Sequence, residues 1–299
     1  MGSKIYLAII LSDYQELNLK RYIDHLKVED ELIVFNGRFK GVNFEKKIIK
    51  FSKNVTIKNF SNKYILLFYF FFVLLKNLFH QKKFIFGNPD GQFNYFLRKF
   101  IDGKNQIYVD DGLITIYYDF NQLKKDCTIF TVYDVKLPSK LKKIRYFPKY
   151  KKKRKKTCDQ ILLIGFPFFI LNALSKDKFV KIMNILSKKN IRFYYYPHKF
   201  EIEELLLLPK NFVVIKRRSS VEQYIYNYKY DFKSIYSFNS SCLIEIVNFY
   251  KKEKIKLFDI NNLIGNSDFN NERKKILNKC NNYMRKLKIR IIKFKQINI

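Results

Sequence analysis

The sequence predicts two α/β domains in tandem, each a doubly wound parallel sheet covered by helices. Short runs rich in Ile, Val, Phe and Tyr alternate with stretches of helical periodicity through both halves, which is typical of a parallel sheet with helices on both faces. The length of 299 residues suits two domains of about 150 residues each. A basic, apolar-poor stretch at Lys136–Thr157, which includes Pro138 and Pro148, is the best domain boundary.

In the first half, most predicted strands are bounded by Asn, Gly or Asp, which favour turns. The expected strands are Lys4–Leu11, Glu31–Phe35, Val55–Phe60, Lys83–Phe86, Gln106–Val109 and Thr128–Tyr133. The expected helices are Glu16–His25, Tyr64–His80 and Gln92–Ile101. The longest apolar run, Tyr64–Leu75, has twelve residues, whereas about 20 are needed to span a bilayer. We therefore expect a buried helix there, with a helix lying on a membrane surface as the alternative.

The second half repeats the alternation of strands and helices. The expected strands are Gln160–Gly165, Arg192–Tyr196, Phe212–Lys216, Ser234–Phe238 and Lys254–Asp259. The expected helices are Asp177–Lys188, Glu201–Leu208, Val221–Tyr228, Ser241–Tyr250 and Glu272–Leu287. Regular strand–helix crossovers favour a second doubly wound domain. We place the domains at 1–150 and 151–299, and we expect the polar last helix to pack back on the first domain.

The net charge of +33 favours anionic partners, namely nucleic acid, a phospholipid surface or nucleotide-bearing substrates. The densest basic run, Lys149–Lys156, is interpreted as a solvated linker, with a phospholipid contact as the alternative. Most aromatic residues fall inside apolar strand or helix runs, as core residues do, so a nucleic-acid partner is not expected. A general Lys, Asn and Ile bias of the composition also lowers the weight of the charge.

The four cysteines, Cys127, Cys158, Cys242 and Cys280, form no C-x-x-C pair and have no His at ligand spacing. This pattern favours neither structural zinc nor a redox dithiol. The first apolar run, Lys4–Leu11, lacks a basic leader and a small-residue cleavage site. We therefore expect a cytoplasmic protein with reduced thiols.

Asp110-Asp111-Gly112 places two carboxylates at the end of a predicted strand. Adjacent strand residues point to opposite faces, so one acid can project while the other holds the turn, and Gly112 permits a sharp exit. The projecting acid can serve as a general base. The alternatives are an ordinary Asp-Gly turn and a Mg²⁺ site, which a second acidic cluster would be needed to complete.

Pro197-His198-Lys199 ends another predicted strand. Histidine can carry a proton near neutral pH and can also release it, so His198 facing a phosphate can protonate or stabilise a leaving group. Lys199 adds a fixed positive charge, and Pro197 fixes the approach of the histidine. The alternative is a structural histidine before a helix.

Ser240-Ser241 lies between an apolar strand and an amphipathic helix. Hydroxyls and free N–H groups at such a junction can bind a phosphate, and plain helix capping is the alternative. Glu222, eighteen residues before Ser240, starts a helix. Its carboxylate can accept both ribose hydroxyls, as acids do in nucleotide sites; the alternative is a first-turn Glu that the helix dipole favours.

In their order along the chain, these four motifs resemble those of the bacterial sialyltransferases with two Rossmann-like domains, in the lipooligosaccharide or capsule branch. That family has an acidic-acidic-Gly motif in the first domain, then a His-Pro motif, a ribose-binding Glu and a Ser-Ser or Ser-Thr motif in the second. Here Pro197 precedes His198 instead of following it. The resemblance implies the GT-B architecture, in which the two domains face a central cleft.

The resemblance also implies an inverting, metal-independent transfer of sialic acid from CMP-sialic acid to a glycan hydroxyl, without a cofactor. Asp111 would be the general base in the acceptor-side first domain, with Asp110 supporting it. In the CMP-binding second domain, His198, Ser240 and Ser241 would contact the phosphate. Glu222, Pro197 and Lys199 would contact the ribose and base, and we assign Asn88 and Ser12 to the sugar or acceptor.

The expected partners are a nucleotide-sugar donor, a glycolipid or glycan acceptor, and an anionic membrane on its inner face. A homodimer is also expected. The nearest alternative keeps the fold and changes the donor to another CMP-nonulosonate or nucleotide sugar. A basic nucleic-acid-binding protein and a catalytically inactive scaffold are the alternatives from other functional classes.

Overall fold

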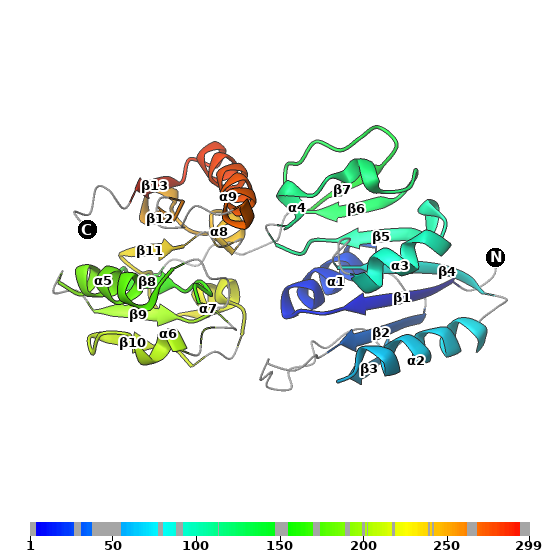
Figure 1. Ribbon diagram of the computed structural model, residues 1–299, viewed down its shortest axis with the longest axis horizontal. Coiled ribbons are helices and arrows are strands. Elements are labelled where there is room, and N and C mark those ends of the chain that lie inside the picture. Colours follow the sequence, from blue (N-terminus) through cyan, green and yellow to red (C-terminus); the bar gives the residue numbers. More distant parts are fainter. Residues whose placement is uncertain are drawn as a thin grey trace. The chain divides into compact units, whose positions relative to one another are not determined.

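Parallel strands form two separate sheets in the computed structural model of the chain (Figure 1). One sheet belongs to the unit Met1–Pro148 and the other to the unit Lys149–Ile299. The structure describes residues 4–26, 31–37, 55–76, 80–87, 92–112, 114–146, 155–169, 174–188, 192–198, 201, 203–216, 219–238, 240, 242–261 and 268–293.

The sheet of the first unit has seven parallel strands in the order β3-β2-β1-β4-β5-β6-β7. The strands are β1 (Lys4–Ile10), β2 (Glu31–Gly37), β3 (Val55–Phe60), β4 (Gln81–Phe86), β5 (Gln106–Val109), β6 (Thr128–Thr131) and β7 (Lys142–Arg145). The strand order reverses between β1 and β4, which is the doubly wound order of dinucleotide-binding folds, and ligands of such sheets bind where the order reverses.

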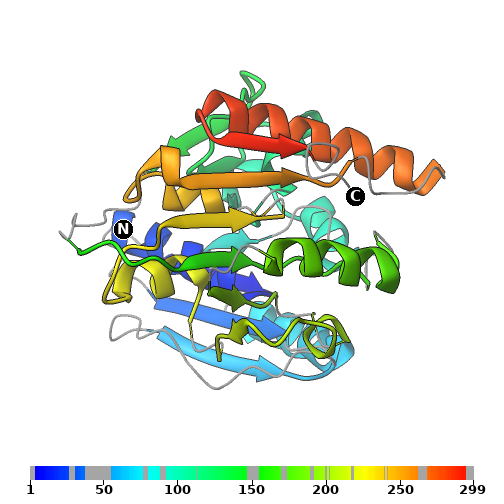
Figure 2. The ribbon, with the colours of Figure 1, turned by 90° about the vertical axis from the view of Figure 1, so that its left-hand side faces the viewer.

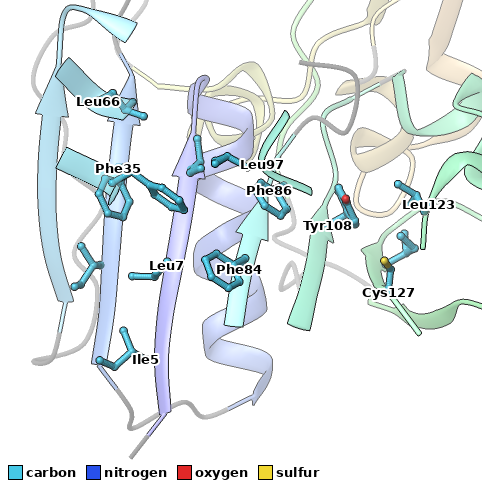
Figure 3. Close-up of a cluster of buried hydrophobic side chains, with 14 of the residues drawn as sticks. Ile5, Leu7, Phe35, Leu66, Phe84, Phe86, Leu97, Tyr108, Leu123 and Cys127 are labelled. Atoms are coloured by element: carbon cyan, nitrogen blue, oxygen red, sulfur yellow. The ribbon is translucent and has the colours of Figure 1, made fainter. Parts of the chain in front are cut away.

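The helices of the first unit are α1 (Asp13–Leu26), α2 (Lys63–Lys76), α3 (Gln92–Phe100) and α4 (Ile114–Tyr117), with single 3₁₀ turns at Gly103–Asn105 and Phe120–Gln122. Helix α1 covers one face of the sheet, where the ring of Tyr22 lies 5.1 Å from that of Phe130. Helices α2 and α3 cover the other face through Leu66, Phe70 and Leu97. Figure 3 shows this second face, with side chains of β1, β2, β4 and β5 in front and α1 behind the sheet.

The expectation that Tyr64–Leu75 is a buried helix is wrong. One side of α2 packs on the sheet, but Tyr64, Phe68 and Leu75 are 69%, 76% and 65% exposed. The helix also ends at Lys76, so His80 lies in the segment before β4 and not in a helix. An all-apolar run predicted burial, but the sheet covers only half of this helix.

The sheet of the second unit has six parallel strands in the order β10-β9-β8-β11-β12-β13. The strands are β8 (Ile161–Ile164), β9 (Phe193–Tyr196), β10 (Phe212–Val214), β11 (Ser234–Ser237), β12 (Ile255–Asp259) and β13 (Arg290–Lys293). Their arrows point the same way in Figure 2. The order again reverses beside the first strand of the unit, between β8 and β11, so both units have the doubly wound topology.

The helices of the second unit are α5 (Lys176–Ser187), α6 (Glu203–Leu206), α7 (Val221–Asn227), α8 (Cys242–Ile246) and α9 (Asp268–Lys286), with a 3₁₀ turn at Lys252–Lys254. Phe179 and Met183 of α5 and Leu277 of α9 belong to one buried cluster with strand side chains such as Phe258. Helix α9 therefore packs in the core of its own unit, and its predicted contact with the first unit stays a prediction.

Two short strands were not predicted. Strand β7 lies inside the basic stretch Lys136–Thr157 that we took as a boundary, and β13 follows the last helix. Each pairs with one neighbour at the end of its sheet. Both have basic residues at their first and last positions, which is common at sheet edges because charge discourages further pairing. The division between the units falls after Pro148, within that basic stretch.

Candidate functional site

The chemically interesting residues of the first unit follow neighbouring strands at one edge of the sheet. Ile9, Phe86 and Tyr108 are in register across β1, β4 and β5. Because the strands are parallel, the residues just beyond them come out at the same edge. The segments that follow are those of Ser12, Gly87 and Asp110-Asp111. This edge is beside the point where the strand order reverses.

Asp110 is built into the fold. Its side chain is buried, and its Oδ2 accepts a hydrogen bond of 2.7 Å from the backbone N–H of Val132, just beyond β6. Its carbonyl accepts a hydrogen bond of 3.1 Å from the Asn18 amide of α1. The Tyr146 hydroxyl donates in turn to the Asn18 side chain at 2.5 Å. Asp110 thus ties the ends of β5 and β6 to α1.

Asp111 is only half-buried, unlike its neighbour. Its backbone N–H donates to Thr115 Oγ1 at 3.3 Å, which links the residue to the short helix α4. Gly112 has a φ of 70°, a left-handed conformation in which a side chain is disfavoured, so the glycine makes the turn as expected. Of the two acids, Asp111 is therefore the one that can meet a ligand.

Ser12 begins the β1–α1 junction as a helix cap. Its hydroxyl accepts a hydrogen bond of 3.2 Å from the Gln15 N–H, and Gln15 Oε1 accepts one of 2.7 Å from the Leu11 N–H. A Cβ at Gly87 would lie 2.1 Å from Gln15 Cδ, so the end of β4 passes against this junction. Asn88 lies outside the described residues.

In the second unit, Tyr196, Ile164 and Ser237 are in register across β9, β8 and β11. His198 therefore leaves the sheet beside Phe166 and on the same edge as Ser240. The edge again adjoins the reversal of strand order. Three of the predicted positions, Pro197, His198 and Ser240, thus come to one edge, whereas Lys199 and Ser241 lie outside the described residues.

Glu201 organises this edge, and the sequence analysis missed it. Its Oε2 accepts a hydrogen bond of 2.6 Å from the backbone N–H of His198. Its Oε1 accepts from the Phe166 N–H at 2.9 Å and from the Tyr195 hydroxyl at 2.6 Å. Since Phe166 follows β8 and His198 follows β9, one carboxyl group fixes two neighbouring strand ends.

The environment of Glu201 changes its protonation. The side chain is 4% exposed, and burial raises its pKa from the ordinary 4.5 to about 8, against the opposing effect of its three hydrogen-bond donors. Gly165 makes room for it, because a Cβ there would lie 2.0 Å from Glu201 Oε2. The sequence placed Glu201 at the start of a helix, where an acid is common, so its role had no visible signal.

Glu222 and Ser240 are brought together by two short helices. Glu222 is buried in the first turn of α7, and α7 packs against α8. Burial raises the pKa of the Cys242 thiol, and the nearby Glu222 carboxylate raises it further. Ser240 Oγ donates to the same Cys242 sulfur at 2.9 Å. Cys242, the first residue of α8, is therefore close to both the predicted ribose ligand and the predicted phosphate ligand.

A contact between β9 and α7 joins this pair to the histidine edge. The Tyr196 hydroxyl donates to the carbonyl of Ser219, just before α7. Ser220 caps α7 by accepting a hydrogen bond of 3.3 Å from the Gln223 N–H. The start of α7 is thus anchored to the end of the strand that leads into His198. Hydroxyls, an imidazole and a carboxylate at one sheet edge can together contact a ribose and a phosphate.

No metal centre is apparent in the described part of the chain, where no group of three or more His, Cys, Asp or Glu could hold an ion. The cysteines are all free, and Cys127, Cys242 and Cys280 are buried. Burial raises the pKa of the Cys127 thiol to about 11, which is the behaviour of an unreactive core thiol.

Two Rossmann-like units in one chain are the architecture of the GT-B glycosyltransferases. An α/β-galactoside α-2,3-sialyltransferase from Photobacterium phosphoreum is similar in structure, with a TM-score of 0.54 and 10% identity over 97% of this chain and 99% of that chain. MurG from *Acinetobacter baumannii* has a TM-score of 0.50 and 7% identity over 98% of this chain and 87% of its own. No family model and no curated protein matches the sequence. The comparisons therefore establish the fold.

Proposed function

We propose that the protein is an inverting, metal-independent glycosyltransferase that moves sialic acid from CMP-sialic acid to a hydroxyl of a cell-surface glycan. In this proposal the bond between the anomeric carbon and the CMP phosphate breaks as the acceptor oxygen attacks from the opposite side. The acceptor proton passes to Asp111. CMP leaves with the electron pair of the broken bond, which adds a negative charge to its phosphate.

The single observation that best supports the proposal is the different burial of the two acids that follow β5. Asp110 is held by the Val132 N–H and is buried, while Asp111 is half-buried beside it. A general base needs to reach its substrate and to be held in place. Asp110 supplies the rigid neighbour and Asp111 the reachable carboxylate.

The second unit would hold the donor. Ser240 and Ser241 would donate hydroxyl hydrogen bonds to the CMP phosphate, and His198 would stabilise or protonate it as it leaves. Glu222 would accept the ribose hydroxyls, with Pro197 and Lys199 near the base. Glu201 positions the His198 backbone and is assigned no direct contact with the donor. The proposal requires the edge of Asp111 and the edge of His198 to meet around one donor–acceptor pair.

The proposed partners follow from charge and from chemistry. The net charge of +33 suits an anionic donor, an anionic glycolipid acceptor and the inner face of the cytoplasmic membrane, where each near-surface Lys or Arg adds about 1 kcal/mol. No helix of the described residues has both the length and the apolar character to cross a bilayer. A homodimer remains part of the proposal.

Release of CMP from CMP-sialic acid tests the assignment of Asp111. We expect Asp111→Asn to lower the rate about 10³-fold, since the amide cannot accept the acceptor proton. Asp24→Asn is the matched control, because Asp24 is an exposed acid of the same unit whose pairing with Lys20 is on the surface. Unchanged CMP release by Asp111→Asn, with a folded protein, would disprove the role of Asp111.

The same assay separates the alternatives for the donor. A panel of CMP-nonulosonates and UDP- or GDP-sugars, each tested with and without a chelator, identifies the donor class and any need for metal. Activity confined to CMP-sialic acid and unaffected by the chelator is expected. Asp111-dependent release from another nucleotide sugar would keep the glycosyltransferase and replace the donor.

A further inference from the structure

The second helix of the first unit is apolar on both sides, but the protein covers only one of them. Leu66, Phe70 and Val73 of α2 are buried against the sheet. The opposite side bears six large exposed side chains, which are Tyr64, Ile65, Phe68, Phe71, Phe72 and Leu75. Successive members of this set are one or three residues apart in the sequence, which puts them on one continuous helix face. A helix that is apolar all round is normally covered on all sides.

Helix α3 extends this apolar face. Phe96 and Phe100 are 47% and 73% exposed, and their rings lie 5.2 Å apart in an edge-to-face contact. A groove of about 460 Å³ lies between the two helices, lined by Phe71 and Leu74 from α2 and by Leu97 and Phe100 from α3, among others. The six residues of α2 together with Phe96 and Phe100 are called the α2–α3 face below.

Positive charge borders the face where α2 ends. Lys76 closes the helix and Lys82 lines the groove with His80. The sequence of α2 contains no acidic residue, and Asp102 is the acid among the groove-lining residues of the described chain. Such a border favours an anionic partner over a neutral or cationic one.

A second observation points to the same partner. Partial burial lowers the pKa of Lys83, and the charges of Lys4, Lys142 and Lys104 lower it further. Lys4 and Lys142 are the first residues of β1 and β7, and Lys104 lies in the 3₁₀ turn before β5. With Lys83 near the start of β4, lysines crowd the amino-terminal edge of the sheet. Because Gln81 and Lys82 at the start of β4 line the groove with Leu74 of α2, this edge adjoins the Leu75 end of the α2–α3 face. An anionic surface would relieve the repulsion among these lysines.

From these features we infer that the α2–α3 face lies in the headgroup region of an anionic lipid bilayer. Helix α2 has 14 residues, or about 21 Å of length, which is less than the hydrocarbon core of about 30 Å. The helix therefore lies in the plane of the interface, with its aromatic and aliphatic side chains inserted and the lysines at phosphate level. An isolated interfacial helix has a polar side that faces water. In α2 that side is instead packed against the sheet of the first unit.

The inference deepens the proposed function, because a glycolipid acceptor is presented at such a surface. Its test does not depend on sugar transfer. The chain contains no Trp, so Phe68→Trp introduces a unique reporter at the most exposed position of the face. Val214→Trp is the matched control, since Val214 is 44% exposed on β10 of the second unit.

With vesicles of phosphatidylglycerol and phosphatidylcholine, we expect the position-68 indole to shift to shorter wavelength and to be quenched by brominated acyl chains. The indole at position 214 should do neither. Vesicles of phosphatidylcholine alone should bind the protein at least about tenfold more weakly. The double variant Phe68→Asp, Phe72→Asp should reduce binding to the anionic vesicles by about tenfold or more, while Val214→Asp leaves it unchanged.

Three outcomes would overturn the inference. In the first, the protein binds the vesicles without a spectral shift at position 68, and about 0.5 M salt abolishes the binding, which would mean purely electrostatic attachment. Another is a concentration-dependent shift without vesicles, which would assign the face to a second copy of the chain. The third is unchanged vesicle binding by the double Asp variant. Far-ultraviolet circular dichroism shows whether each variant is folded. Absence of CMP release by the wild type would count against the proposed function and not against this inference.

Discussion

Both units fix their strand ends with a buried carboxyl group, but the two groups are placed differently in the chain. In the first unit, Asp110 directly precedes the reachable Asp111 and ties β5 to β6 through Val132. In the second, Glu201 follows His198 by three residues and ties the segments after β8 and β9 through Phe166 and His198. The same structural task is thus done by an acid within the motif in one unit and by an acid outside it in the other.

The comparison teaches that a motif and its support need not be adjacent in sequence. A doubly wound sheet brings its strand ends to one edge, and those ends have free backbone N–H groups that need acceptors. A carboxyl group can accept from several of them at once. Wherever two loops leave neighbouring strands, a single acid can set the position of the residue that meets the substrate.

Removal of the two acids should have unequal effects. We expect Glu201→Ala to destabilise the second unit by about 4 kcal/mol, because it leaves the Phe166 and His198 N–H groups and the Tyr195 hydroxyl without this acceptor. Asp110→Ala should cost the first unit about 2 kcal/mol through the lost Val132 contact.

Urea unfolding with a unit-specific indole measures both effects. The Val214→Trp background reports the second unit, and Phe71→Trp, at a position 42% exposed, reports the first. An equal loss of stability in the two units, or a smaller loss for Glu201→Ala, would mean that the acid outside the motif is not the stronger support.

The pH dependence sharpens the comparison further. The pKa of Glu201 rises from 4.5 to about 8 on folding, so the folded chain binds this proton more tightly than the unfolded chain does. Stability from this group is therefore complete below about pH 4.5 and is lost as the pH rises to about 8. Between pH 5 and pH 8 we expect wild type to lose about 3 kcal/mol more than Glu201→Gln, whose side chain does not titrate.

The measurement is the urea midpoint of the second unit at four pH values, in both proteins. Only the difference between the two slopes reports Glu201, since other groups titrate equally in wild type and variant. Parallel slopes would show that Glu201 is ionised throughout, and the three donors would then outweigh the effect of burial.

Much of this fold was predictable from the sequence, and the reasons are local. Gln106–Val109, for example, has the composition and the boundaries that predict a buried parallel strand, and all four of its residues are buried. Strands β7 and β13 were missed because a basic edge strand of four residues has little apolar signal. Composition showed that α2 is apolar, but only the packing shows which side the protein leaves uncovered.

The candidate site was predictable in part for the same reason. Asp110-Asp111-Gly112, His198 and Ser240 each follow a strand, so the predicted strand ends located them. Glu222 was placed by the predicted start of a helix, and it lies in the first turn of α7. Glu201 is different, because its importance comes from the approach of Phe166, thirty-five residues earlier in the chain. A contact between distant segments leaves no spacing or motif that could be recognised in a single sequence.

Two glycines provide the finest test of the comparison, because each directly follows a strand and each faces a loop-fixing side chain. A Cβ at Gly165 would lie 2.0 Å from Glu201 Oε2 and 2.8 Å from the Tyr195 hydroxyl, whereas a Cβ at Gly87 would meet the Gln15 side chain at 2.1 Å. Glu201 accepts hydrogen bonds from three donors, whereas Gln15 Oε1 accepts one from the Leu11 N–H. Gly165→Ala should therefore cost about 2 kcal/mol and Gly87→Ala about 1 kcal/mol.

The unit-specific indoles again measure both losses, and the Glu201→Gln background tests their cause. If Gly165→Ala acts by displacing Glu201, its cost should fall when the Glu201 contacts are already weakened, since coupled neighbours are not additive. Gly87→Ala should cost the same in either background, because it belongs to the other unit. Full additivity at Gly165 would mean that the glycine is needed for its backbone and not for the space that Glu201 occupies.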